Sequence, residues 1–102
     1  MGWKIIIAPS AQADLADIVR YIARHNTDAA ARLGFELITC AENLANFPEI
    51  GRIVPEFQLS NLREVVRRSY RIIYRLRADE QRIDIVRFWH AARGFPRIPV
   101  TP

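Results

Sequence analysis

A segment near the C-terminus constrains the fold most, because its side chains change character at nearly every second residue. It runs from Tyr70 to Arg77 with the sequence YRIIYRLR, and its arginines fall mainly on alternate positions. Successive side chains of a β-strand point to opposite faces, so this period predicts a strand with one apolar and one cationic face. An apolar sheet face has to be covered. The segment therefore needs partner strands and a covering layer.

Three further segments are predicted to be strands. Residues 3–8 are rich in β-branched side chains and are closed by Pro9, and residues 62–68 and 83–90 flank the alternating segment. The polar stretch 77–82 suits a hairpin turn before the last strand. We expect one N-terminal strand and three C-terminal strands.

Two amphipathic helices are predicted between these strands. Apolar side chains recur at helical spacing after Ser10 and again after Thr27, and both residues are suitable N-caps. About four residues join the helices, so they form an antiparallel hairpin whose apolar stripes need a sheet to pack on. The prediction is an α+β fold of order β-α-α-β-β-β, with a small antiparallel-rich sheet and the helical hairpin on one face. Residues 1–102 form one domain, and residues 94–102 are a Pro-rich tail.

Composition excludes several classes of protein. Half of the residues are apolar and the mean hydropathy is near zero, as in soluble globular domains. The longest strongly apolar run, residues 5–8, is far too short to span a bilayer, and nothing resembles a signal peptide, so we expect a cytoplasmic protein without a membrane partner. Cys40 is the single cysteine, and no spaced set of His or Asp residues accompanies it. We expect neither metal nor cofactor.

Charge is divided unevenly along the chain. Residues 62–102 hold ten arginines and four acidic side chains, a net charge of +6, whereas residues 1–61 hold five basic and seven acidic side chains, a net charge of −2. This distribution indicates a polyanionic or acidic partner for the C-terminal half.

The predicted hairpin also gives the arginines neighbours. If Leu76 faces Ile83, then Arg71, Phe88 and His90 share the face away from the helices, with His90 about 7 to 8 Å diagonally from Arg71. Arginine beside an aromatic ring and a histidine suits phosphate contacts with base stacking.

In this register we expect two other arginines to have structural rather than functional roles. Arg75 opposes Asp84, which predicts a cross-strand ion pair. Arg87 falls on the apolar side, which predicts a β-bulge near it or an edge position.

Four segments taken in order resemble the RelE/ParE superfamily of toxins, the toxin halves of type II toxin-antitoxin modules, also called plasmid stabilisation proteins. They are LANFPEIGRIVPE at 44–56, LRE at 62–64, YRIIYR at 70–75 and IDIVRFWHAAR at 83–93. The resemblance covers about residues 3–93 and implies a small sheet carrying a helical hairpin. Residues 47–64 are most similar to the ParE-like branch.

The resemblance implies one of two activities. ParE members inhibit DNA gyrase by binding it, whereas RelE-like members cleave mRNA in the ribosome. For a ParE-like chain we expect growth inhibition through gyrase or a similar macromolecular target, neutralised by a cognate antitoxin protein. The candidate residues for binding the target or a nucleic acid are Arg63, Arg67, Arg68, Arg71, Phe88 and Arg93.

The ribonuclease alternative assigns catalytic roles. Arg71 matches the family arginine that contacts the scissile phosphate, and His90 matches a C-terminal histidine that serves some members as acid or base. Glu56 or Glu64 could be the base, and a positioned acid or base contributes roughly 10² to 10⁴ in rate. RelE itself has paired lysines where this chain has LRE at 62–64, and a Pro-rich tail replaces the terminal tyrosine of some family ribonucleases, which favours the ParE-like reading. A third alternative is a degenerate, non-toxic module that still binds antitoxin.

Overall fold

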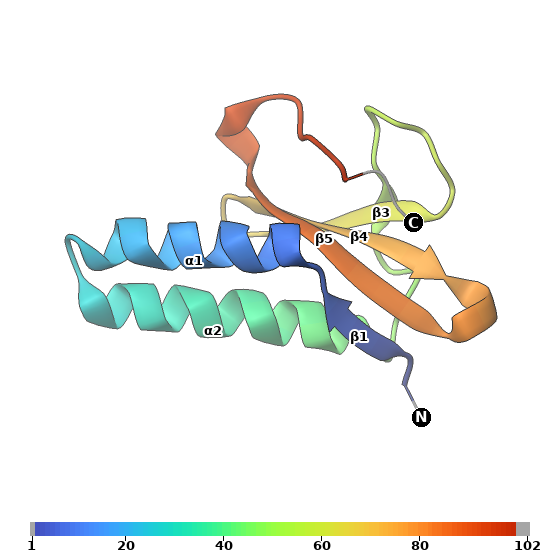
Figure 1. The fold of residues 1–102 in the computed structure, drawn as a ribbon, viewed down its shortest axis with the longest axis horizontal. Coiled ribbons are helices and arrows are strands. Elements are labelled where there is room, and N and C mark those ends of the chain that lie inside the picture. Colours follow the sequence, from blue (N-terminus) through green and yellow to red (C-terminus); the bar gives the residue numbers. More distant parts are fainter. Residues whose placement is uncertain (1, 100–102) are drawn as a thin grey trace.

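The computed structural model describes residues 2–99 as a mixed five-stranded sheet with two helices on one face (Figure 1). The elements in chain order are β1 (Lys4–Ile7), α1 (Pro9–Ala23), α2 (Thr27–Asn43), β2 (Arg52–Ile53), β3 (Leu62–Arg67), β4 (Tyr70–Arg77) and β5 (Arg82–His90). Short 3₁₀ turns follow β4 at Ala78–Glu80 and β5 at Ala91–Arg93. The α+β class and the order of the predicted elements are confirmed.

The strand order is β1-β5-β4-β3-β2, and β1 pairs with β5 in parallel while the other neighbours are antiparallel. The two-residue strand β2 was not predicted. Residues 94–99 of the tail contain neither helix nor strand, and residues 100–102 lie outside the described part of the chain. No helix within residues 2–99 is long and apolar enough to cross a membrane.

Both helix starts differ from the predicted caps. Helix α1 begins at Pro9 after Ala8, and the Ser10 hydroxyl donates a hydrogen bond to the Val86 carbonyl oxygen at 2.7 Å. Proline fits the first helical position because it lacks an N–H that would need a partner there. Helix α2 is capped by Asn26, whose side chain accepts a hydrogen bond from Ala29 N at 3.0 Å.

The sheet buries side chains on both faces. The helix-facing cluster consists of Ala11, Leu37, Ala41, Leu44, Ile72, Tyr74, Ile83, Ile85 and Phe88. The smaller cluster on the opposite face consists of Val54, Leu62, Ile73, Val86 and Trp89. Phe57 and Ile98 pack on the second cluster, so the loop after β2 and the C-terminal segment cover this face (Figure 1).

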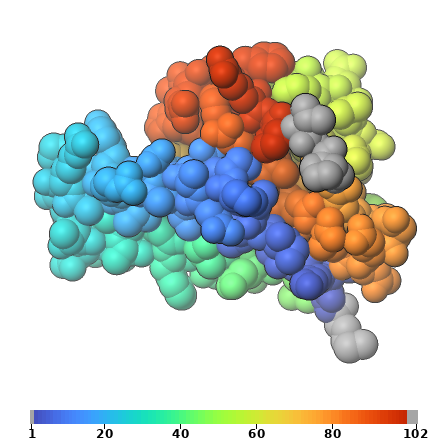
Figure 2. Space-filling view, in the orientation of Figure 1, coloured from blue at the N-terminus to red at the C-terminus, as the bar shows by residue number. Residues whose placement is uncertain are grey.

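The helical hairpin extends beyond the sheet at one side of the molecule (Figure 2). Tyr21 and Phe35, both on these helices, are among the exposed large apolar side chains.

A β-bulge divides the β4–β5 ladder into two registers. Arg75 lies opposite Asp84 as predicted, but the register shifts after Tyr74, so that Ile73 pairs with Arg87. The predicted bulge near Arg87 is confirmed. Every pairing predicted beyond it is wrong by one residue, because the extra residue in β5 reverses the faces that follow.

Asp14 of α1 holds this bulge in place. Its carboxylate accepts hydrogen bonds from Arg87 Nε and NH2, both at 2.7 Å, and from the backbone N of Phe88 at 3.1 Å. Asp14 and Arg87 are both largely buried, so each satisfies the charge of the other. The bulge is thus tied to the helical hairpin.

Candidate functional site

Arg71 lies at the centre of a cluster of charged side chains on the face opposite the helices. Its Nε donates to Glu64 Oε1 at 2.5 Å, and its NH1 and NH2 donate to the two carboxylate oxygens of Glu56 at 2.8 and 2.7 Å. Each of the three guanidinium nitrogens therefore donates to a carboxylate. The Arg71 side chain is only 9% exposed.

Glu64 is the most deeply buried member, with its side chain 0% exposed. Its second oxygen accepts from Arg52 Nε at 2.6 Å, since β2 pairs with β3 and places Arg52 opposite Glu64. Two arginines and two glutamates thus form a cluster without net charge. We call Arg52, Glu56, Glu64 and Arg71 the Arg71 cluster.

The arginines of the cluster keep the carboxylate of Glu56, the more exposed of the two glutamates, ionised. The hydrogen bonds from Arg71 lower the pKa of Glu56 despite the opposing effect of burial. The same bonds from Arg71 to Glu56, and then its bond to Glu64, raise the pKa of Arg71 further above its usual range. Because every guanidinium nitrogen of Arg71 already binds a carboxylate, the cluster stabilises the packing of β2, β3 and β4. An incoming anion would have to displace Glu56 to reach Arg71.

Gly51 and Tyr74 support the cluster from behind. Gly51 N donates to Tyr74 Oη at 3.0 Å, and that hydroxyl donates to the Pro48 carbonyl at 2.9 Å. A Cβ on Gly51 would lie 2.6 Å from the Glu64 carbonyl oxygen and 2.5 Å from Tyr74 Oη, so only glycine lets the chain approach β3 this closely.

His90 lies apart from the Arg71 cluster. The bulge pairs His90 with Tyr70 and Arg71 with Trp89, so the expected shared face of Arg71, Phe88 and His90 is wrong. His90 Nδ1 accepts a hydrogen bond from Ala92 N at 3.1 Å, and its ring packs edge-on to Tyr70 with centroids 5.1 Å apart.

A cleft of about 610 Å³ lies beside His90. It is lined by residues of α1, of β4 and β5 and of the 3₁₀ turn after β5, among them Tyr21, Tyr70, Phe88 and Arg93. Phe88 is otherwise buried in the helix-facing core, at 1% exposure. The Arg93 guanidinium carbon lies 4.1 Å from the centroid of the Trp89 ring, close enough for a cation–π contact.

The remaining candidate arginines are held by other groups. Arg68 binds both oxygens of Glu36 on α2 at 2.8 and 2.7 Å, and Arg67 Nε lies 3.5 Å from the same carboxylate. Arg63 NH1 donates to the Gly51 carbonyl at 3.1 Å, while its Nε is buried without a hydrogen-bond partner.

No group of three or more His, Cys, Asp or Glu side chains that could hold a metal occurs among residues 2–99.

Comparison with known proteins assigns the family. Residues 5–95 match the family described as "ParE toxin of type II toxin-antitoxin system, parDE". The chain belongs to the RelE/ParE superfamily of type II toxins. A relative from Caulobacter vibrioides, Toxin RelE2, is 40% identical over 83 residues, which cover 81% of this chain and 89% of the relative.

Two solved structures share the fold of this toxin at 18% identity. One is the toxin-antitoxin complex RelBE2 from Mycobacterium tuberculosis, with a TM-score of 0.68 and 88% of this chain and 99% of that chain covered. The other is the chromosomal ParDE toxin-antitoxin system from P. aeruginosa, with a TM-score of 0.69 and coverage of 86% and 95%.

Sequence reasoning missed two residues that shape the toxin's charged groups. Arg52 joins the Arg71 cluster through a strand of two residues, which gives no periodic signal. Asp14 is a charged residue of an amphipathic helix and would be expected to face solvent, yet it is buried against Arg87. One feature of the sequence pointed to Asp14. The predicted register puts Arg87 on the apolar face, and a buried arginine requires a carboxylate partner.

Proposed function

We propose that this toxin inhibits growth by binding a macromolecular target, with DNA gyrase as the first candidate, and that it acts without cleaving RNA. The closure of Arg71 between Glu56 and Glu64, with His90 on the other face of the sheet, is the observation that carries this proposal.

RNA cleavage by a 2′-hydroxyl needs a base, a cation on the phosphate and an acid at the leaving oxygen, all close to one phosphate. A catalytic acid or base has to lie about 2.6 to 3.2 Å from the proton it moves, or one water molecule away. Arg71 is engaged by two carboxylates, and the ring nitrogen Nδ1 of His90 is engaged by Ala92 N. A binding role requires no such convergence.

A cognate antitoxin is the second part of the proposal. The C-terminal half carries a net charge of +6, which favours a partner with an acidic segment that orders on binding. The two solved relatives are toxin-antitoxin systems, which supports the same kind of partner here.

One observation favours ribosome-dependent mRNA cleavage as the second candidate. Three of the four catalytic candidates, Glu56, Glu64 and Arg71, lie in one cluster. Glu56 is the more exposed of the two carboxylates, at 23%, and its release would leave Arg71 facing solvent with Glu64 beside it.

The test uses a variant that keeps the role of His90 in the fold. In His90→Asn the amide oxygen takes the place of Nδ1 as the acceptor for Ala92 N, while the acid-base group is lost. Wild type and His90→Asn are induced, and growth, plasmid supercoiling and the 5′ ends of mRNA are measured.

We expect both proteins to arrest growth equally, with loss of negative supercoiling and intact mRNA. Codon-phased cuts that fall by about 10² or more in His90→Asn would select the ribonuclease instead. Growth without arrest, together with retained binding of an antitoxin encoded beside the toxin, would identify a degenerate module and refute the proposal.

A further inference from the structure

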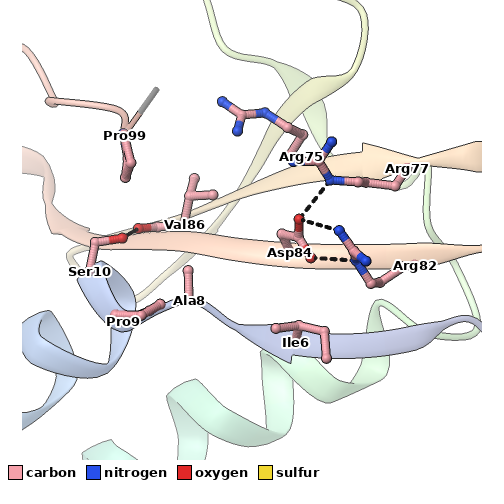
Figure 3. Close-up of a pocket in the computed structure, with 10 residues that line it drawn as sticks. All are labelled: Ile6, Ala8, Pro9, Ser10, Arg75, Arg77, Arg82, Asp84, Val86 and Pro99. Atoms are coloured by element: carbon pink, nitrogen blue, oxygen red, sulfur yellow. Dashed lines mark hydrogen bonds and ion pairs between the residues drawn. The ribbon is translucent and has the colours of Figure 1, made fainter. Parts of the chain in front are cut away.

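A second cleft, of about 560 Å³, lies on the sheet face opposite the helices and is distinct from the Arg71 cluster. It crosses β1, β5 and β4 and is closed at one end by the start of α1 and by Pro99 (Figure 3). Figure 3 shows its charged side chains gathered at one end and its apolar side chains, apart from Ile6, at the other.

Cations outnumber anions at the charged end. Asp84 accepts hydrogen bonds from Arg77 Nε at 2.8 Å and from Arg82 Nε at 2.9 Å, and Arg75 lies opposite Asp84 in the ladder. Arg82 NH1 also donates to Glu80 Oε2 at 2.9 Å, at the rim of the cleft. Three arginines thus face two carboxylates, which leaves a local net charge of +1.

Burial makes this excess unfavourable in the free protein. It lowers the pKa of Arg75, and the neighbouring Arg77 cation lowers it further, with Asp84 opposing the shift. A further carboxylate placed here would stabilise the charged form of Arg75. The arrangement therefore favours an incoming anion.

The other end of the cleft is apolar. Its floor and walls include Ala8, Pro9, Val86 and Pro99, and Ile6 lies beside the arginines with 37% of its surface exposed. Such a floor suits an aliphatic side chain rather than an ion.

We propose that this cleft binds an extended acidic segment of a protein partner, with its carboxylates at Arg75, Arg77 and Arg82 and an aliphatic side chain on the apolar floor. Charge complementarity selects a polyanion, and the apolar floor selects a peptide among polyanions. A nucleic acid fits less well, because none of the lining residues offers an aromatic ring for a base to stack on.

The probe is a fluorescein-labelled synthetic peptide, Glu-Ile-Asp-Ile-Glu, measured by fluorescence anisotropy at low salt. Two control peptides separate the contributions: Gln-Ile-Asn-Ile-Gln lacks the carboxylates, and Glu-Ser-Asp-Ser-Glu lacks the aliphatic side chains. Backbone NMR shifts locate the bound peptide, because a protein with a net charge of +4 attracts acidic peptides over its whole surface.

Each substitution inside the cleft is matched by a control substitution outside it that changes the net charge by the same amount. Asp84→Asn removes a competing carboxylate, and Asp28→Asn removes an exposed carboxylate of α2 with the same change in net charge. Arg82→Gln removes one of the cations, and Arg24→Gln is its control at the exposed end of α1. Circular dichroism checks that each variant is folded.

We expect Asp84→Asn to bind the peptide about threefold more tightly than Asp28→Asn, and Arg82→Gln to bind it about threefold more weakly than Arg24→Gln, as for partly exposed ion pairs. Both control peptides should bind more weakly, and the NMR shifts should centre on Ile6, Ala8 and Val86. Equal or weaker binding by Asp84→Asn, or shifts spread over the surface, would show that the arginines only hold Asp84. Preferred binding of a short oligonucleotide at the same residues would also refute the proposal.

Discussion

Glu64→Gln tests the Arg71 cluster most sharply, because it changes one buried atom and little of the shape. The Glu64 carboxylate accepts hydrogen bonds from Arg71 at 2.5 Å and from Arg52 at 2.6 Å, with its side chain fully buried. An amide has one oxygen and one NH₂ group, so one of the two guanidinium groups would face a donor instead of an acceptor.

The expected cost follows from these contacts. A hydrogen bond to a charged group contributes about 1.5 to 3 kcal/mol, and a buried donor left unpaired adds to the loss. We expect Glu64→Gln to lower the free energy of unfolding by about 3 kcal/mol, within the range for breaking a buried pair. For a domain of this size that corresponds to a melting temperature lower by roughly 12 °C.

Glu56→Gln is the matched control, since its carboxylate also binds Arg71 but is 23% exposed. Water can replace part of its contact, so we expect a cost of about 1 kcal/mol. Urea unfolding followed by tryptophan fluorescence measures both variants, with Trp89 in the cluster on the same face of the sheet. Equal costs for the two variants would refute a cluster organised around Glu64.

Three further outcomes are expected. Gly51→Ala should destabilise the fold by about 2 kcal/mol in the same assay, because the new methyl group would clash with the backbone of Glu64. Asp14→Asn should cost about 3 kcal/mol, because it leaves Arg87 buried without its carboxylate, whereas the same change at an exposed aspartate of that helix should cost little. The pKa of Glu56 is lowered in the folded state, so its contribution should be constant above about pH 5 and should decrease as the pH falls from the ordinary pKa of glutamate, about 4.3, towards the lower folded-state pKa. The stability difference between wild type and Glu56→Gln, measured from pH 3 to pH 7, should therefore be constant at the upper end and decrease steadily towards the acid end.

The sequence predicted the fold through local patterns. The alternation from Tyr70 to Arg77 defined strand β4 and its two faces, and helical spacing defined the hairpin. These signals depend on neighbours in sequence, so one chain suffices to read them.

The site was harder to predict because it depends on distant residues. A bulge fixed by Asp14, some 73 residues before Arg87, reverses the faces of Phe88, Trp89 and His90. One inserted residue therefore separated His90 from Arg71. The pairing of Arg71 with two glutamates likewise depends on loop and strand contacts that no local period encodes.

A titration of purified DNA gyrase with the toxin tests the central claim most directly. If the toxin acts by binding, inhibition of supercoiling should follow the ratio of toxin to gyrase, and His90→Asn should inhibit as well as wild type. In a parallel translation extract, ribosome-bound mRNA should remain intact. Unaffected gyrase together with multiple turnovers of codon-phased mRNA cleavage would contradict the account.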